Sequence, residues 1–230
     1  MVIPSPFTNG LTPVLNGLKQ DLKDKYIEGI GSGEKTLCFG LTEPDAGSDV
    51  WGIKTRAVKD GNEWVINGTK QWISHAHYAD YCMLFAVTNP ELQAKRKGGI
   101  TCFFVETSSE GFNVDSVIPV MGSLGGDATI ISIDNLRVPE GNIIGELDQG
   151  FGKAMNGINN GRLGMSGKCI GSAQWALQKA VEYSKIRKTF GKTLSEHQTI
   201  QNMLAECALD IYAARNMALH CAWKIENSTK

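Results

Sequence analysis

The sequence predicts an α+β fold: an antiparallel β-sandwich or barrel in the middle of the chain, flanked by helical segments. Two observations support this prediction. The spacing of apolar residues is three to four before Lys35, two from there to about Val138, and three to four again after Gly150. Hydrophobic residues make up 42% of the 230 residues and charged residues 20%, which is enough apolar surface for a packed core. We therefore expect a helical segment at 1–33, a β-domain at 34–145, and the start of an up-down helix bundle at 146–230.

The first segment is predicted to form one or two short helices. Apolar residues recur at helical spacing between residues 11 and 30, and a cluster of glycines at Gly29, Gly31 and Gly33 ends the pattern.

The middle segment is predicted to consist of short strands joined by tight turns. Asp60-Gly61-Asn62 separates two alternating runs, 53–58 and 63–66, which is a strong hairpin signal because glycine tolerates the positive φ of such a turn. Asn67-Gly68 predicts a second turn. Further strands are expected at Tyr81–Val87, Thr101–Glu106, Phe112–Val117 and Thr129–Ile133. Strands this closely spaced favour an antiparallel sandwich or barrel over βαβ units.

The last segment is predicted to be a pair of amphipathic helices joined by the loop Arg187–Leu194. Ser195-Glu196-His197-Gln198 is typical of a capping box, in which Ser195 and Gln198 would satisfy the first N–H groups of the second helix. An amphipathic pair needs partners to cover its apolar stripe, so either the protein pairs with other chains or the chain is incomplete.

Charge and composition exclude several functions. The formal net charge is −1, so no basic field attracts nucleic acid. No window approaches the roughly 20 apolar residues of a membrane span, and the N-terminus lacks the features of a secretion signal. The six cysteines show no CxxC spacing and indicate a reducing compartment. His75-x-His77 lacks a cluster of further ligands, so no metal site is expected.

Three stretches contain residues suited to binding an anionic or aromatic group. Phe39–Asp49 reads as a strand end followed by a Gly- and Ser-rich turn, whose N–H groups suit a phosphate; the alternative is an ordinary turn. Trp72 offers a flat ring that could pack on an aromatic cofactor or in the core, and Ser74 offers a donor at the strand end. Arg187, Lys188 and Lys192 could bind phosphate or could be solvated cations near a helix end.

Together, in this order and spacing, the three stretches resemble the acyl-CoA dehydrogenase family. Thr42-Glu43-Pro44-x-Ala46-Gly47-Ser48-Asp49 matches its first signature, Trp72-Ile73-Ser74 its tryptophan strand, and Arg187-x-Thr189-Phe190-Gly191 with His197-Gln198 its helical cofactor loop. The resemblance runs from about Leu11 to Lys230. It implies that residues 1–33 are the tail of an N-terminal helical domain and that the helices from 146 begin the C-terminal domain.

The resemblance implies a role for each matching residue. One group would line the flavin and pyrophosphate of FAD, with Ser48 near the CoA as well: Phe39, Leu41, Thr42, Gly47 and Ser48. A second group would flank the flavin ring: Trp72, Ile73 and Ser74. A third would reach the FAD of a neighbouring subunit: Arg187, Thr189, Phe190, His197 and Gln198. Asn159 and Arg162 would contact the acyl-CoA.

The implied reaction is α,β-dehydrogenation of an acyl-CoA thioester to the 2-enoyl-CoA. A carboxylate would remove the α-proton while the β-hydrogen leaves as hydride to the flavin. In most members the base is a Glu on a late loop beyond the position of Lys230, and in a minority it precedes the arginine equivalent to Arg162, where this chain has Gly161. We therefore expect no catalytic base in this chain. Glu43, although acidic, is expected to be structural.

The chain departs from the family at two further positions, and two alternative functions stay open. Many members have Asp at the position of Asn159 and Asn at the position of His75. The alternatives are an acyl-CoA oxidase on the same scaffold and a non-catalytic relative that binds FAD or CoA. The resemblance also implies a homo-oligomer, a tetramer or a dimer, that passes electrons to electron-transferring flavoprotein. It further implies a location in the bacterial cytoplasm or the mitochondrial matrix.

Overall fold

The computed structural model describes residues 16–122 and 127–227, which form two compact units that meet between Asn159 and Asn160. The first unit contains a helix, α2 (Gln20–Ser32), and a seven-stranded sheet. The second contains most of a long helix, α4 (Gly150–Ser184), and a further helix, α5 (Gln198–Asn227). Residues 11–15 of the predicted first helix lie outside the described residues. The domain boundaries at 33 and 145 stay a prediction.

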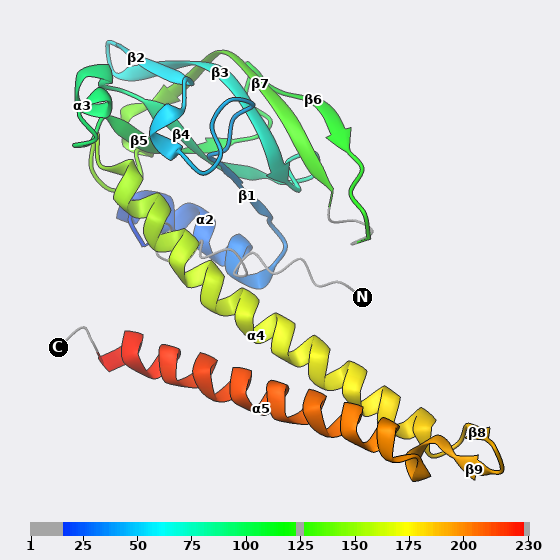
Figure 1. Cartoon of the computed structure of the whole chain (residues 1–230). Helices are drawn as coiled ribbons and strands as arrows, with labels where there is room; N and C mark the ends of the chain where they lie inside the picture. The colour runs from blue at the N-terminus through cyan, green and yellow to red at the C-terminus, as the bar shows by residue number, and fades with distance from the viewer. Residues whose placement is uncertain (1–15, 123–126, 228–230) are drawn as a thin grey trace. The chain divides into compact units, whose positions relative to one another are not determined.

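The sheet curls around the middle of the first unit (Figure 1). Its strands are β1 (Leu37–Gly40), β2 (Arg56–Asp60), β3 (Glu63–Ser74), β4 (Tyr81–Val87), β5 (Ile100–Glu106), β6 (Phe112–Ile118) and β7 (Ala128–Pro139). The order is β1-β4-β2-β3-β7-β6, with β5 on the other edge of β4. A short helix, α3 (Pro90–Ala94), lies between β4 and β5. The predicted α+β fold, with a barrel-like β-domain flanked by helical segments, is confirmed, and the sheet has the form of a curled half-barrel.

Most strand pairs are antiparallel, but β4 pairs with β1 and β2 in parallel. This mixture explains the continuous apolar run of β4, because both faces of the strand are buried. Met83 and Phe85 pack on the face that α2 covers, whereas Cys82 and Leu84 pack on the opposite face inside the curl of the sheet. The sheet therefore has a core on each side.

The predicted hairpin is confirmed, and the predicted second turn is wrong. Asp60 pairs with Glu63, so β2 and β3 are joined by a two-residue loop at Gly61 and Asn62. At Gly68, however, β3 continues through an irregularity in its register with β7. Gly68 has φ +155°, and a Cβ there would lie 2.4 Å from Oγ1 of Thr55. The glycine thus permits a close approach of two segments rather than a reversal of the chain.

The predicted strands after this hairpin are confirmed with small changes at their ends. β4 has the expected bounds, β5 begins one residue earlier, and β6 ends one residue later. β7 is much longer than expected and runs to Pro139, since its second half pairs with the first half of β3.

The second unit is a helical hairpin, as predicted. Two short strands, β8 (Lys188–Thr189) and β9 (Lys192–Thr193), form the connection between α4 and α5 (Figure 1). The capping box predicted at Ser195 lies two residues earlier, at Thr193 and Glu196, and it caps a short 3-10 helix (Leu194–Glu196) that precedes α5. Glu196 Oε2 accepts hydrogen bonds from N (2.7 Å) and Oγ1 (2.8 Å) of Thr193, and α5 begins at Gln198. Thr193 therefore takes the capping role that was predicted for Ser195.

The cysteines divide between the units. All six are free: Cys38, Cys82 and Cys102 are buried in the sheet, whereas Cys169, Cys207 and Cys221 are exposed on the helices. Within the described residues no helix is both long and apolar enough to cross a membrane.

Candidate functional site

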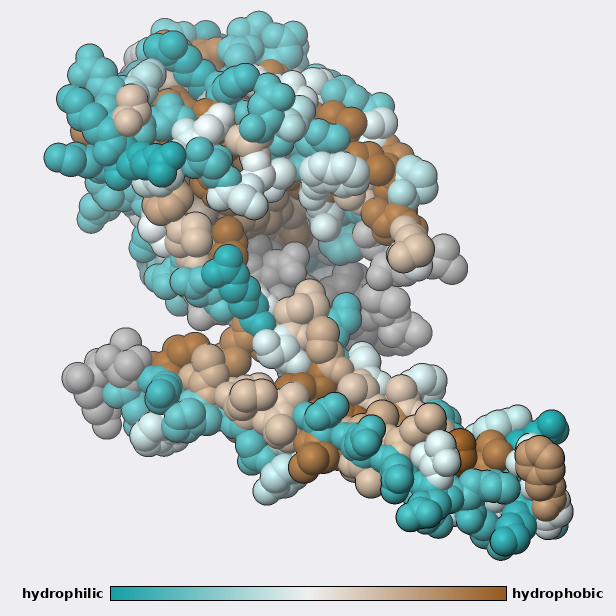
Figure 2. Space-filling view, in the orientation of Figure 1, coloured by the Kyte–Doolittle hydropathy of each residue, from teal (hydrophilic) through white to brown (hydrophobic). Residues whose placement is uncertain are grey.

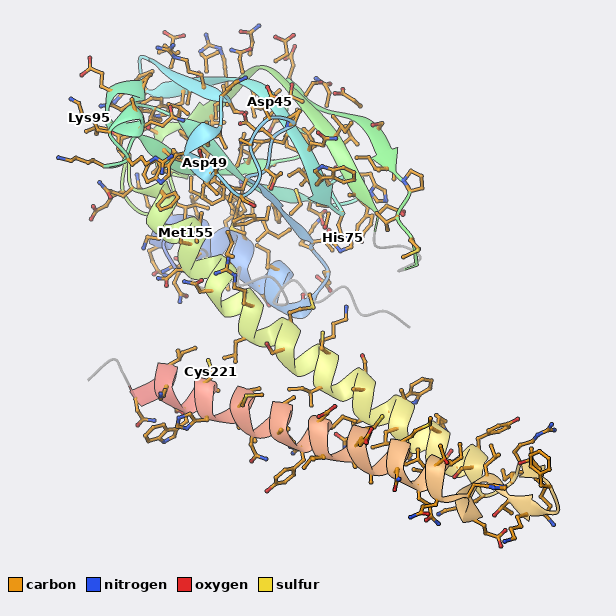
Figure 3. All side chains as sticks on the ribbon, viewed as in Figure 1. Asp45, Asp49, His75, Lys95, Met155 and Cys221 are labelled. Atoms are coloured by element: carbon orange, nitrogen blue, oxygen red, sulfur yellow. The ribbon has the colours of Figure 1, made fainter. Side chains whose placement is uncertain are left out.

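A tight turn follows β1 and shapes the first predicted motif. Glu43 and Ala46 exchange two backbone hydrogen bonds, Glu43 N to Ala46 O at 2.9 Å and Ala46 N to Glu43 O at 3.2 Å. This pair closes the turn around Pro44 and Asp45. The next residues, Gly47 and Ser48, are exposed. Figure 3 labels Asp45 and Asp49 on this loop. A short, closed turn thus presents a glycine and a hydroxyl to solvent.

The side chain of Glu43 fastens both ends of the loop. The carboxylate is buried and accepts hydrogen bonds from Lys54 N at 2.6 Å and Thr55 N at 3.0 Å. Lys70 of β3, which is fully buried, donates to Glu43 Oε1 at 2.8 Å and to Leu41 O at 3.1 Å. The prediction that Glu43 has a structural role agrees with these contacts. A buried cation on the sheet and a buried anion on the loop therefore hold the loop against β3.

The pKa of Glu43 reflects this environment. Burial raises it, but the charge of Lys70 and the hydrogen bonds from Lys70, Thr55 and Lys54 outweigh burial, so the net pKa lies below its ordinary value. Burial lowers the pKa of Lys70, and Glu43 opposes that effect. A buried charge is tolerated only where it is paired and hydrogen-bonded, and both conditions are met here.

A β-bulge in β3 presents the indole of Trp72. The register of β3 on β7 shifts between Lys70 and Ile73, which leaves Gln71 and Trp72 as the bulged residues. Trp72 has φ 61°, and 55% of its surface is exposed. The bulge is attached to the loop, since Gln71 N donates to Thr42 O at 2.9 Å. Bulges re-aim side chains, and this one directs a large aromatic ring outward beside the first motif.

The remaining predicted residues of the first unit are less exposed. Phe39 is half-buried against Phe85, with ring centroids 5.0 Å apart. Leu41 and Ile73 are buried, so any contact of theirs with a ligand would involve the backbone. The carbonyl of Ile73 already accepts a hydrogen bond from Thr129 Oγ1 at 2.9 Å. Ser74 is half-buried at the end of β3.

The residue after Ser74 has an unusual backbone. His75 has φ 69°, and its backbone N donates to Asp127 O at 3.1 Å. Its Nδ1 shares a short hydrogen bond with the hydroxyl of Tyr78. Burial lowers the pKa of His75, His77 lowers it further, and Asp127 opposes the shift. Figure 3 labels His75 at the end of β3.

The third motif lies in the second unit, on the loop between its helices. Arg187 N donates to Tyr183 O at 3.0 Å, and Leu194 N donates to Arg187 O at 2.8 Å, which closes the loop. Phe190 lies at the tip of this loop with φ 52° and 95% exposure. His197 Nε2 lies 3.4 Å from Oγ1 and 3.3 Å from the carbonyl of Thr189, which orients the imidazole.

Three further predicted residues lie on exposed helical positions. Gln198 is the first residue of α5, and Asn159 and Arg162 lie on α4. The described contacts therefore join the first two motifs to each other within one unit and order the third motif by itself. The binding role of each predicted residue stays a prediction.

Lys70 is an important residue of this site that was not among those predicted from the sequence. A signal for it exists in the alternation of β3, because Trp64 and Ile66 point inward and Lys70 continues the same phase. The phase then changes at the bulge, which is why Ile73 is buried and Trp72 is not. A lysine at an inward position predicts a buried anion nearby, and Glu43 is that anion.

The fold and site define an α+β protein in which a closed loop and an aromatic bulge are held together on one curled sheet. Comparisons with known proteins identify the family. The model of the acyl-CoA dehydrogenase middle domain matches residues 38–136, and the model of the acyl-CoA dehydrogenase C-terminal domain matches residues 148–230. The chain belongs to the acyl-CoA dehydrogenase family.

Individual relatives agree with this assignment. The caffeyl-CoA reductase-Etf complex subunit CarC of Acetobacterium woodii is 36% identical over 93% of this chain and 55% of the relative. The structure of butyryl-CoA dehydrogenase from Megasphaera elsdenii matches with a TM-score of 0.89 and 34% identity over 96% of this chain and 57% of that one. A glutaryl-CoA dehydrogenase from Mycobacterium smegmatis in complex with FADH2 matches with a TM-score of 0.83 and 28% identity, over 94% and 54% of the two chains. The chain thus spans about half the length of the relatives it matches.

Proposed function

We propose that the protein binds FAD and takes part in α,β-dehydrogenation of an acyl-CoA thioester. The observation that carries this proposal is the connection between the first two motifs. Gln71 N donates to Thr42 O and Lys70 donates to Glu43, so these bonds hold the exposed loop and the exposed indole of Trp72 next to each other in the same unit. A loop suited to a phosphate beside a flat ring suited to an aromatic group matches the two chemical halves of a flavin dinucleotide.

The residues present fit that cofactor. Gly47 is exposed, and a Cβ built there would have no atom within 4 Å, so the loop backbone is open to a ligand. Ser48 adds an exposed hydroxyl for an anionic oxygen. The exposed part of Trp72 would pack on the flavin ring, with Ser74 near it as a donor. A relative of known structure was solved with FADH2.

When bound, FAD would supply the acceptor for the hydride from the β-carbon of the thioester. The residues of this chain would hold and orient it: Gly47 and Ser48 at the phosphates, Trp72 and Ser74 at the ring. Asn159 and Arg162 would contact the acyl-CoA. The expectation that none of residues 1–230 is the base that removes the α-proton stays a prediction.

Electron-transferring flavoprotein is the proposed acceptor of the electrons. The support is the name of one relative, which is a subunit of an Etf complex.

Self-association of the chain is also proposed. The helices of the second unit expose large apolar side chains, including Trp175 at 64%, Tyr212 at 69% and Met217 at 68%. Figure 2 shows hydrophobic side chains along these helices. Apolar surface on this scale favours burial against another chain. In a homo-oligomer the loop from Arg187 to Gln198 would reach the FAD of a neighbouring subunit.

The purified chain provides the test. FAD is titrated into it, and binding is followed by quenching of flavin fluorescence. Acyl-CoA thioesters of increasing chain length are then added without oxygen. Saturable FAD binding, with a shift of the visible flavin band when acyl-CoA is added, supports the proposal; bleaching of the band is not required, because no base is expected among residues 1–230. Absence of FAD binding by the folded protein would refute the proposal. If no thioester changes the flavin absorbance, the FAD-binding part of the proposal stands and the acyl-CoA part is refuted. Rapid reoxidation by oxygen would favour the oxidase alternative.

A further inference from the structure

We propose that Glu43 and Lys70 are positioning residues for the cofactor: their buried ion pair sets the distance and orientation between the phosphate-binding loop and the ring-binding tryptophan. This inference rests on the proposed function, because the ligand that meets both segments is FAD.

The two charges connect three segments that are far apart along the chain. Glu43 lies 27 residues before Lys70, and the carboxylate also accepts hydrogen bonds from two N–H groups at the far end of the loop. Lys70 also donates a hydrogen bond to the carbonyl of Leu41, which lies between β1 and the turn. One ammonium group and one carboxylate therefore fix the start of the loop, its end, and the strand that presents Trp72.

The position of Lys70 in β3 gives the pair its effect on the aromatic ring. Lys70 immediately precedes the bulge, and the next residue, Gln71, bonds through its N–H to Thr42 O. Trp72 follows directly with φ 61°. The side chain of Lys70 and the backbone of Gln71 thus attach the bulge to the loop at two adjacent points, so any movement of the loop is transmitted to the indole.

Stability alone does not explain why these two buried positions are charged. Replacing a buried ion pair by apolar side chains of similar volume is often neutral or stabilising. Hydrocarbon side chains, however, cannot receive two backbone N–H groups or donate to a carbonyl, and those directional bonds determine where the loop lies. The pair is therefore suited to geometry, and its loss should affect ligand affinity separately from folding.

The test uses two single variants and their combination. Lys70→Met and Glu43→Gln each leave one partner buried without its counter-charge, so both should lower the melting temperature and weaken FAD binding. The double variant Glu43→Gln/Lys70→Met removes both charges at similar volume. We expect its melting temperature to lie above that of either single variant, because no unpaired charge is left, while its FAD affinity stays roughly tenfold weaker than that of the wild type, the loss that follows one misplaced hydrogen bond to a ligand.

A matched control separates this effect from loss of any surface lysine. Lys59 lies on β2, outside the proposed site, and its ammonium lies 2.7 Å from the carboxylate of Glu140. Lys59→Met removes this exposed ion pair. This variant should change the melting temperature only slightly and leave the FAD affinity unchanged, because exposed ion pairs contribute little to stability.

The outcomes distinguish the inference from the proposed function. If the wild type binds FAD and the double variant recovers FAD affinity together with thermal stability, the pair is only structural and the inference is overturned. If the double variant does not fold, Glu43→Gln is assayed at a temperature where circular dichroism shows it fully folded, and an unchanged FAD affinity there also overturns the inference. If the folded wild type binds no FAD, the proposed function fails first and the inference fails with it.

Discussion

Replacing Trp72 by alanine should weaken FAD binding without unfolding the protein. A tryptophan buries roughly 150–250 Å² when fully covered. Because 55% of Trp72 is exposed, about 100 Å² is available to a ligand. At about 25 cal/mol per Å², covering that whole area would contribute about 2.5 kcal/mol. A planar ring covers only one face of the indole, so we expect about half of this, which corresponds to roughly tenfold weaker FAD binding.

The assay is a fluorescence titration of FAD into wild type, Trp72→Ala and Trp72→Phe, with a melting curve for each. Phenylalanine keeps part of the flat surface and should give an intermediate affinity. Val58→Ala on β2, also 55% exposed, is the control for loss of an equally exposed apolar side chain. Equal FAD affinities for wild type and Trp72→Ala, or a large fall in the melting temperature of Trp72→Ala, would refute the reasoning that this ring serves a ligand rather than the core.

Three further predictions concern the backbone, a histidine and a helix end. Gly68→Ala places a Cβ 2.4 Å from Oγ1 and 2.6 Å from Cα of Thr55. Urea unfolding should therefore show a free energy of unfolding lower by about 3 kcal/mol. A decrease below about 1 kcal/mol would mean that the two segments move apart easily. The pKa of folded His75 lies below its ordinary 6.5, so the unfolded chain binds the proton first and stability falls as the pH drops below about 6.5. Melting curves should show this slope diminished in His75→Asn, and an identical slope would exclude His75 as its source. Thr193→Ala removes the capping box and should cost about 1 kcal/mol by chemical unfolding, whereas Ser195→Ala should cost less.

The sequence was sufficient for most of the fold because the local signals agree with the tertiary structure. The apolar run of β4 and the Asp-Gly hairpin before β3 are both strong local patterns, and both appear as expected. The turn predicted at Gly68 failed for a tertiary reason. Its glycine is required by the approach of Thr55, and no pattern within β3 contains that information.

The candidate site was predictable to the level of its motifs but not of its contacts. The motifs containing Ser48 and Trp72 could be recognised by their order and spacing. The bond between Gln71 and Thr42 depends on which strands pair, and a bulge decides that Trp72 rather than Ile73 is exposed. A bulge shifts the alternation by one residue, so simple periodicity assigns the wrong face to everything after it.

The closure of the loop by Glu43 has a consequence for chain entropy. Bringing together the ends of a flexible segment of about twelve residues has an entropic free-energy cost of about 2 kcal/mol. This cost grows by only about 0.6 kcal/mol when the segment doubles in length. In this protein the carboxylate reaches from Glu43 to the N–H groups of Lys54 and Thr55, so folding closes the segment before any ligand arrives. Residues could therefore be inserted or replaced between these anchors, for example at Gly47 and Ser48, at low conformational cost. This makes the loop a favourable place to change ligand preference by insertion.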